Sequence, residues 1–413
     1  MKAMLSRDHA YADNHPVIEV SGSKSESNRL LILQALYPNV GISNLSDSDD
    51  TRLLQQALAN SNSREIDVHH AGTAMRFLTS YLAIQDGRTV VLTGSDRMKQ
   101  RPISILVDAL RNLGAKIEYI GETGFPPLKI QGTVLQTTEV KIESGTSSQY
   151  ISSLLLIAPS LPNGLKIKMK GNVTSRPYID MTCHLLRGIG CQVDMSENSI
   201  QIYPLVKPDP VNVVVESDWS SASYFYSVVS LSENLSVTLR SYKHNSLQGD
   251  AAVSNIYKSL GVDTRFDEMN NRIVLAKNEK PVTKKLTLDL ARTPDIAQTI
   301  AVSCFGHGIA CELTGLHTLK IKETDRLAAL KNELEKLGGK VEITKDSLLL
   351  SPAERMNGGI VINTYDDHRM AMAFAPLALK HSIGIEDPEV VSKSFPSFWE
   401  AIARTGIRTE IQR

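Results

Sequence analysis

A repeat of about 70 residues runs through the chain and constrains its fold more than any other feature. Five segments share the same order of an amphipathic helical pattern, a glycine and a short alternating strand. The glycines are Gly114, Gly190, Gly261, Gly338 and Gly406, at spacings of 76, 71, 77 and 68 residues. A glycine just past a helix commonly ends it in the left-handed conformation. Residues 48–69 resemble a sixth, shortened copy that lacks the glycine.

A second series of helices alternates with the first and begins at small or hydroxyl-bearing residues. Its starts are marked by Thr73, Ser147, Ser220, Asp295 and Asp367, at intervals of 74, 73, 75 and 72 residues. Strands such as TVVLTG and LSVTLRS separate the helices, and this alternation predicts an α/β fold. Solenoid repeats are usually shorter, ~20–50 residues, so six larger units predict two domains of three units each.

The helix starts of the two halves differ in chemistry. The first three carry hydroxyls, glycine and cations, including Lys24 and Arg29, although a helix N-terminus disfavours positive charge. The last three carry Asp218, Asp295 and the pair at 366–367. Cations at a helix start are tolerable when an anion lies between them and the backbone N–H groups. If these ends converge, one domain supplies an anion cradle and the other supplies acids.

Composition narrows the class of partner. The 413 residues include 45 Lys and Arg against 45 Asp and Glu, so the formal net charge is zero. This balance argues against a general nucleic-acid or membrane-surface binder. The sequence shows no signal-peptide apolar region and no apolar run near the ~18 residues of a membrane span. The four cysteines form no CxxC pair, which favours free thiols in a reducing cytosol and no metal site.

Six dense polar stretches stand at helix starts or in the loops between units: AGTAMR, DRMKQRP, GTSSQY, KETDRL, DDHRMAMAF and SKSFPSFW. Each has an ordinary interpretation alone, because serines cap helices and mixed charge runs form solvated first turns. SGSKSESNR lacks the G-x-x-x-x-G-K pattern of a P-loop. Their recurrence at matching positions of the repeat nevertheless favours one shared anion-binding site.

Together with SGSKSESNR, TSSQYISSLLL, SRPYID and RTPDIAQT, these stretches resemble, in order and along nearly the whole chain, the 5-enolpyruvylshikimate-3-phosphate synthase family. The resemblance implies two inverse α/β-barrel-like domains, each of three repeated βα units. It assigns residues 22–217 to the N-terminal domain and residues 1–21 plus 218–413 to the C-terminal domain. A double hinge is expected near 20–22 and 216–218.

The resemblance also implies the reaction: the enolpyruvyl group of phosphoenolpyruvate moves to the 5-hydroxyl of shikimate 3-phosphate, and phosphate is released through a tetrahedral intermediate. Both substrates are polyanions, and eight basic residues occupy motif positions: Lys24, Arg29, Arg76, Arg101, Lys322, Arg326, Arg369 and Lys393. Shikimate 3-phosphate is expected to contact Lys24, Ser25, Arg29, Ser147, Ser148, Gln149, Ser175, Asp295 and Lys322. Phosphoenolpyruvate is expected to contact Lys24, Gly72, Arg101, Gln149, Arg326, Arg369 and Lys393.

Three catalytic roles follow from the same resemblance. Asp295 is expected to act as the base near the attacking hydroxyl. Glu323, with Lys24, is expected to protonate and later deprotonate the methylene carbon, and burial would have to raise the pKa of that carboxyl. The resemblance implies no cofactor, a cytoplasmic monomer, and inhibition by glyphosate in the phosphoenolpyruvate site beside Gly72.

This chain departs from the family pattern at three positions. His70 and Thr318 stand where family members often have Asn, and Arg176 replaces a frequent Lys. Two other functions remain open. A sister family transfers the same group to UDP-N-acetylglucosamine, but it often carries a cysteine in the loop that reads GSDRMKQRP here. The third possibility is a non-catalytic phosphate-binding protein, which would release no phosphate.

Overall fold

Both predicted helix series are present in the computed structural model, which describes residues 1–8, 13–60, 63–143, 145, 147–171, 175–278, 283–353 and 355–412. The series with polar starts comprises α1 (Lys24–Leu36), α3 (Gly72–Ala83), α5 (Ser148–Ile157), α7 (Trp219–Leu231), α9 (Ala297–His307) and α11 (His368–Phe374). The second comprises α2 (Asp49–Ala59), α4 (Ser104–Asn112), α6 (Arg176–Gly188), α8 (Val253–Ile256), α10 (Arg326–Lys336) and α12 (Phe398–Ala403). All five predicted stop glycines have positive φ, from 76° at Gly261 to 104° at Gly114.

The chain divides into a continuous unit, residues 22–215, and a split unit, residues 1–21 with 216–413. The strands of the continuous unit are β3 (Val40–Ser43), β4 (Glu65–Asp67), β5 (Thr89–Thr93), β6 (Lys116–Tyr119), β7 (Leu128–Gln131), β8 (Glu139–Glu143), β9 (Leu165–Lys170), β10 (Val193–Met195), β11 (Ser199–Ile202) and β12 (Val211–Val214). Those of the split unit are β1 (Lys2–Arg7), β2 (Val17–Ile18), β13 (Ser236–Arg240), β14 (Val262–Asp267), β15 (Arg272–Lys277), β16 (Lys285–Asp289), β17 (Ala310–Thr314), β18 (Val341–Ile343), β19 (Leu348–Leu350), β20 (Val361–Ile362), β21 (Ile383–Glu386) and β22 (Ile407–Gln412).

A complete repeat contributes one four-stranded sheet with a fixed strand order. The sheets β4-β5-β7-β6, β8-β9-β11-β10 and β16-β17-β19-β18 are built alike. The first two strands are parallel and are connected through a helix of the first series, whereas the last two form an antiparallel hairpin. Parallel neighbours require such a crossover connection, and a hairpin needs only a turn. The predicted α/β fold class is confirmed.

Each unit is completed by strands that are distant in sequence. In the split unit, β1 lies between β21 and β22, and β2 pairs with β13. In the continuous unit, β12 pairs in parallel with β3, with Val211 opposite Val40. This two-stranded sheet belongs to the repeat that the sequence predicts to be shortened, because α2 leads to β4 with no hairpin among the described residues.

Two residues that the sequence analysis placed in the N-terminal domain belong to the split unit. The Glu216 carboxylate accepts from Trp219 Nε1 at 2.7 Å and from the Lys243 backbone N–H at 2.9 Å. The Ser217 hydroxyl donates to the Val20 carbonyl at 2.6 Å. These contacts hold residues 216–217 against the split unit, so its boundary lies two residues earlier in the chain than 218.

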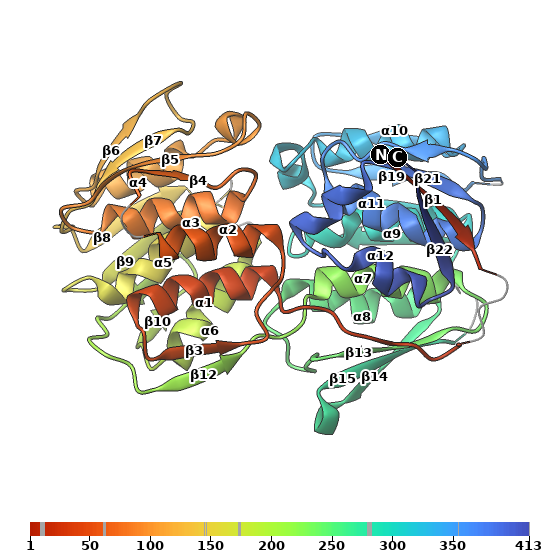
Figure 1. Cartoon of the computed structure of the whole chain (residues 1–413), viewed down its shortest axis with the longest axis horizontal. Coiled ribbons are helices and arrows are strands. Elements are labelled where there is room, and N and C mark those ends of the chain that lie inside the picture. The colour runs from red at the N-terminus through yellow and green to blue at the C-terminus, as the bar shows by residue number, and fades with distance from the viewer. Residues whose placement is uncertain are drawn as a thin grey trace. The chain divides into compact units, whose positions relative to one another are not determined.

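Three helices of the first series form the centre of each unit (Figure 1). In the continuous unit, α1, α3 and α5 contact one another, and in the split unit α7, α9 and α11 do so. Small hydroxyl side chains lie between neighbouring helices: Ser223 lies 3.1 Å from Thr299 Oγ1, and Ser303 donates to Ser227 at 2.8 Å. Buried hydroxyls need such partners. Several serines in these helices are therefore packing residues as well as polar starts.

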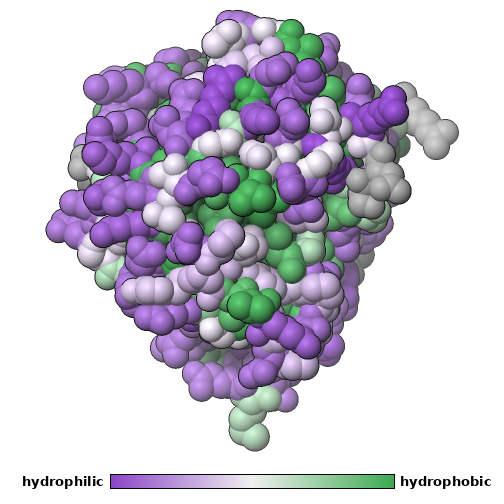
Figure 2. Space-filling model, turned by 90° about the vertical axis from the view of Figure 1, so that its left-hand side faces the viewer, coloured by the Kyte–Doolittle hydropathy of each residue, from purple (hydrophilic) through white to green (hydrophobic). Residues whose placement is uncertain are grey.

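The face of the molecule in Figure 2 is mostly hydrophilic, with apolar side chains gathered near its centre. Apolar atoms contribute roughly 55–60% of the surface of an ordinary folded protein, so apolar side chains on such a face are expected. Among the described residues, no helix has the length and apolar character needed to cross a membrane. All four cysteines are buried and unpaired, as the sequence predicts.

We expect the folding stability of the protein to fall in mild acid because of His307, the last residue of α9. Its Nε2 lies 2.7 Å from Ser230 Oγ, and burial, with Lys277 and Lys380 nearby, lowers its pKa to about 4. The unfolded chain therefore binds more protons at this site between pH 6.5 and about 4, so stability falls as pH falls through this window, by at most roughly 3 kcal/mol. Chemical denaturation at several pH values measures this loss. His307→Gln should reduce it, and an unchanged pH dependence would contradict the assignment.

Candidate active site

Several predicted site residues of each unit lie at the N-terminal ends of its central helices. In the continuous unit Lys24 and Gly72 begin α1 and α3, and Ser147 caps α5. In the split unit Asp295 lies in the 3-10 turn before α9, and Asp367 caps α11. Helix N-termini present unsatisfied N–H groups and positive dipole ends, which favour anions. The cap of α1 is Ser23, whose hydroxyl accepts from Glu26 N at 3.4 Å.

Arg29 is a buried cation that connects three helices. Its side chain is 2% exposed. It donates to Thr182 Oγ1 at 2.7 Å, Ser152 Oγ at 3.0 Å, and the carbonyls of Ser25 and Tyr178 at 2.7 and 3.3 Å. Burial lowers its pKa to about 10, although Tyr178 and Glu26 act in the opposite direction. No described carboxylate lies within 4.0 Å of its guanidinium, and its described hydrogen-bond partners are neutral hydroxyls and carbonyls.

Arg101 lies directly against the first residue of α3. A Cβ atom built on Gly72 would lie 2.5 Å from Arg101 Nη1 and 3.0 Å from Cζ. The guanidinium makes no hydrogen bond or ion pair with the described residues, and its Nε is buried without a partner. A cation in this state at a helix N-terminus is suited to bind an anion.

The start of α5 is fixed to the start of α3. Ser147 Oγ accepts from the Gln149 N–H at 3.3 Å, and Gln149 Nε2 donates to Thr73 Oγ1 at 3.2 Å. Ser148 is buried. Ser175, just before α6, has a left-handed backbone with φ of 53°. The predicted residues of these helices therefore stand at adjoining helix starts.

Asp50 is a neighbour of Lys24 that the sequence analysis did not select. Its carboxylate lies 3.6 Å from Lys24 Nζ and 3.9 Å from His70 Nε2. The side chain is buried in the first turn of α2. Acidic residues are common in the first turn of a helix, so nothing in the sequence distinguished Asp50 from an ordinary solvent-exposed acid at a helix start.

The split unit holds a dense group of buried charges centred on Arg326. This guanidinium is 2% exposed and contacts three carboxylates: Asp367 at 2.6 Å, Glu323 at 2.8 Å and Asp295 at 3.0 Å. Burial alone would lower the pKa of Arg326, but these acids raise it above its ordinary value. Arg326 is therefore charged at every physiological pH and holds the acids in place.

Asp295 has cations on several sides. Lys322 Nζ lies 3.5 Å away, Arg326 Nη1 3.0 Å and Arg369 Nη2 3.5 Å. Burial by itself would raise the pKa of this carboxyl. The surrounding cations outweigh burial and hold the pKa well below its ordinary value. An ionised carboxylate is the form a general base requires.

Asp250 is a second acid that the sequence analysis missed. It is buried and accepts hydrogen bonds from the hydroxyls of Ser220 and Thr293. Burial and the neighbouring Asp295 raise its pKa, against the opposing charge of Arg369. It lies in a 3-10 turn with no other acid nearby in sequence, so no local pattern distinguished it.

Three further residues of the split unit named in the sequence analysis are Lys393, Glu323 and Thr318. Lys393 Nζ donates to the Asp366 carbonyl at 2.6 Å. Glu323 is 21% exposed and pairs with Arg326, so the burial expected for a proton-holding carboxyl is incomplete. Thr318 is buried, and its hydroxyl has no hydrogen-bond partner among the described residues.

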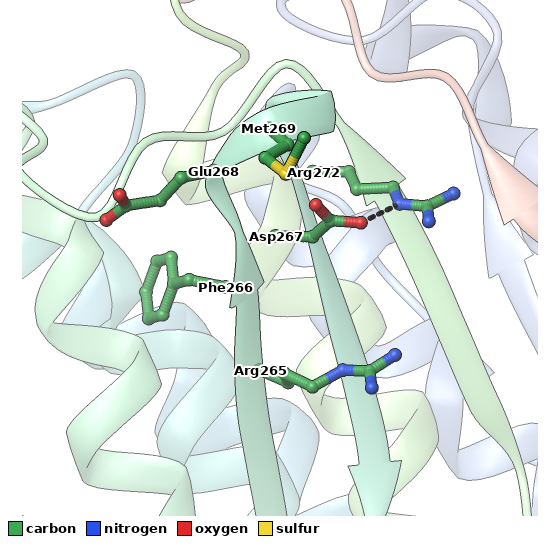
Figure 3. Close-up of a pocket in the computed structure, with 6 residues that line it drawn as sticks. All are labelled: Arg265, Phe266, Asp267, Glu268, Met269 and Arg272. Carbon is green, nitrogen blue, oxygen red and sulfur yellow. Dashed lines mark hydrogen bonds and ion pairs between the residues drawn. The ribbon is translucent and has the colours of Figure 1, made fainter.

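A surface cavity of about 570 Å³ lies at the hairpin β14–β15 (Figure 3), away from these residues in the sequence. Its lining is Arg265, Phe266, Asp267, Glu268, Met269 and Arg272. Arg272 Nε donates to Asp267 at 2.7 Å, which satisfies much of the local charge. The cavity contains none of the predicted site residues.

Comparison with known proteins gives consistent matches. Residues 54–402 match the model of the family described as EPSP synthase (3-phosphoshikimate 1-carboxyvinyltransferase). The 3-phosphoshikimate 1-carboxyvinyltransferase of Bacteroides fragilis strain YCH46 is 44% identical over 402 residues, covering 95% of this chain and 96% of that protein. The protein of the same name from Pectobacterium carotovorum is 35% identical over 94% and 95% of the two chains.

Solved structures share the fold. EPSP synthase from Acinetobacter baumannii superposes with a TM-score of 0.79 at 23% identity, with both chains fully covered. The enolpyruvyl transferase NikO from Streptomyces tendae gives a TM-score of 0.73 at 14% identity, over 100% of this chain and 99% of that one.

Proposed function

The chain belongs to the EPSP synthase family and transfers the enolpyruvyl group of phosphoenolpyruvate to shikimate 3-phosphate. We propose that residues at the central-helix starts, together with those of the neighbouring loops and of the start of α10, carry this reaction. The reaction belongs to the shikimate pathway of aromatic amino acid biosynthesis. The observation that most supports the residue assignment is the guanidinium of Arg101, which lies against Gly72 with its Nε buried and without a hydrogen-bond partner among the described residues.

Each substrate is assigned a set of contacts. For shikimate 3-phosphate the set is Lys24, Ser25, Arg29, Ser147, Ser148, Gln149 and Ser175 of the continuous unit, with Asp295 and Lys322 of the split unit. For phosphoenolpyruvate the set is Lys24, Gly72, Arg101 and Gln149, with Arg326, Arg369 and Lys393. Arginine suits a bidentate grip on phosphate or carboxylate, and lysine acts as a point charge.

The proposed chemistry has two proton-coupled steps. In the addition, Asp295 takes the proton of the 5-hydroxyl as its oxygen bonds to C2 of phosphoenolpyruvate, and C3 gains a proton from Glu323, assisted by Lys24. In the elimination, C3 returns a proton to the same group, the C2–C3 double bond re-forms, and the C2–O bond to phosphate breaks. The leaving phosphate takes the proton held by Asp295, so both carboxyl groups return to their starting states. The low pKa of Asp295 makes it a weak base while the cations stay close. Substrate anions that compete for Lys322 and Arg369 would raise the pKa of Asp295 and so make it a stronger base.

Phosphate release tests the function directly. The protein is incubated with phosphoenolpyruvate and either shikimate 3-phosphate or UDP-N-acetylglucosamine. Release that requires shikimate 3-phosphate is expected. Release only with the UDP-sugar would overturn the assignment to shikimate 3-phosphate, and release with neither would overturn the proposed catalysis.

Lys393→Met and Arg101→Lys should both weaken the use of phosphoenolpyruvate and spare shikimate 3-phosphate. Loss of a charged hydrogen bond to a bound anion typically costs about 1.5–3 kcal/mol, so the KM for phosphoenolpyruvate should rise roughly ten- to a hundredfold. Calorimetry of the binary complex measures shikimate 3-phosphate affinity separately. A comparable loss of that affinity would show that the two residues are misassigned.

Gly72→Ala should raise the inhibition constant of glyphosate by a larger factor than the KM for phosphoenolpyruvate. Glycine lets a ligand approach the backbone closely. In the structure the added methyl first meets the Arg101 guanidinium, 2.5 Å away at Nη1, so some rise in KM is also expected. Steady-state inhibition of both proteins gives the two factors. Equal factors would mean that Gly72 does not line the inhibitor's part of the site.

We also propose that the protein acts as a monomer in the cytoplasm. Four buried free thiols suit a reducing compartment. Sedimentation velocity across a concentration series tests the oligomeric state, and a concentration-dependent shift to a dimer would contradict it.

A further inference from the structure

Arg76 lies one turn into α3 and does not face the solvent. It is 4% exposed, and it was counted only as one of the basic residues at motif positions. Three described residues accept hydrogen bonds from its guanidinium. Nη1 donates to the Gly72 carbonyl at 3.2 Å and to Met98 Sδ at 3.4 Å, and Nη2 donates to the Pro102 carbonyl at 3.1 Å.

These acceptors surround Arg101. Met98 and Pro102 precede and follow it in the same loop, and Gly72 is the residue against which its guanidinium rests. The single guanidinium of Arg76 therefore binds the loop at Met98 and at Pro102, and it also binds the start of α3 at Gly72. Arginine can do this because its donors form a rigid fork, whereas lysine offers a single ammonium.

A second donor acts on the same carbonyl. Tyr150, buried in α5, donates its hydroxyl to the Pro102 carbonyl at 2.6 Å. Met98 is buried as well, and the Arg101 N–H donates to its carbonyl at 3.1 Å. The loop is thus anchored from α3 and from α5, while the Arg101 side chain itself has no hydrogen-bond partner among the described residues.

We propose that Arg76 is a positioning residue for phosphoenolpyruvate: it fixes the 98–102 loop so that Arg101 stays over the start of α3, with Tyr150 as its partner on the Pro102 carbonyl. The inference rests on the proposed assignment of Arg101 to phosphoenolpyruvate. Arg76 need not touch the substrate, because its described donors face protein acceptors. A flexible guanidinium would bind more weakly, since the site would have to order it first.

The test uses three variants: Arg76→Lys, Tyr150→Phe and the double variant that carries both changes. Arg101→Lys serves as the reference. Arg76→Lys keeps the charge but removes the fork, and should raise the KM for phosphoenolpyruvate at least about tenfold. Tyr150→Phe removes one neutral hydrogen bond and should raise it about threefold. Because both donors hold one carbonyl, the double variant should fall short of the product of the two factors. The dissociation constant of shikimate 3-phosphate should stay within about twofold.

Arg111→Lys is the matched control. Arg111 Nε and Nη2 donate to the Ile117 carbonyl at 3.0 and 2.6 Å, so the change removes the same type of contact elsewhere in the continuous unit. Its KM values should be unchanged. If Arg101→Lys raises the KM for phosphoenolpyruvate but Arg76→Lys and Tyr150→Phe do not, this inference is overturned and the proposed assignment stands. Equal losses for both substrates would also overturn it, and a neutral Arg101→Lys would overturn the assignment itself.

Discussion

Glu323→Gln is expected to bind both substrates and to reduce kcat by roughly 10²–10⁴-fold, the usual contribution of a general acid–base group. Glu323 Oε2 accepts from Arg326 Nη2 at 2.8 Å. The amide oxygen of glutamine can accept the same hydrogen bond, so the shape of the site and the contact should persist. The amide cannot exchange a proton with the methylene carbon. Turnover and proton transfer are therefore lost together, while binding remains.

Phosphate-release kinetics and calorimetry measure the two properties separately. Glu335→Gln is the control, because Glu335 lies on the same stretch of chain, in α10, but pairs at the surface with Lys331 at 2.9 Å. That variant should keep wild-type kcat. Near-wild-type turnover of Glu323→Gln would remove Glu323 from the mechanism and leave the methylene proton to another group.

The second large effect is expected on folding. Arg326→Met leaves Asp295, Glu323 and Asp367 without their shared guanidinium, and Asp367 is fully buried. Removing one partner of a buried ionic group typically costs about 3–5 kcal/mol. Activity should be lost in the same variant, because Arg326 also holds the proposed base. The stability of Arg326→Lys should lie between those of the wild type and Arg326→Met, because one ammonium group cannot replace contacts to three carboxylates.

The tryptophans give this experiment a selective signal. The chain has two, Trp219 and Trp399, and both belong to the split unit. Denaturation followed by their fluorescence therefore reports on the unit that carries the substitution. Lys331→Met, which breaks an exposed pair worth about 0–1 kcal/mol, is the control. A loss below about 1 kcal/mol for Arg326→Met would show that Arg326 does not organise the acids.

The sequence predicted the repeat well because its signals are local. A stop glycine or a polar helix start acts within one turn, so Gly338 and Asp295 could be identified from their neighbours alone. The buried partners could not. Asp50 and Asp250 become site neighbours only through packing between segments that are distant in sequence.

The contacts of Arg76 were likewise not predictable from the sequence. In the sequence analysis it was counted among eight basic residues at motif positions and was assigned no substrate contact. In the structure its guanidinium donates to Gly72, Met98 and Pro102. The chemistry of a side chain can be predicted from sequence, but the direction in which it points depends on the loop that packs against it.

The strand arrangement sets the order in which the two units can finish folding as the chain leaves the ribosome. Every strand of the continuous unit lies between residues 40 and 214, so this unit can finish folding once that stretch has left the exit tunnel. The split unit cannot, because β1 at residues 2–7 inserts between β21 and β22, which ends at residue 412. Its first strand must remain unpaired throughout synthesis. Such a segment is the natural substrate of a chaperone that binds extended chains, and its docking would be the last event of folding.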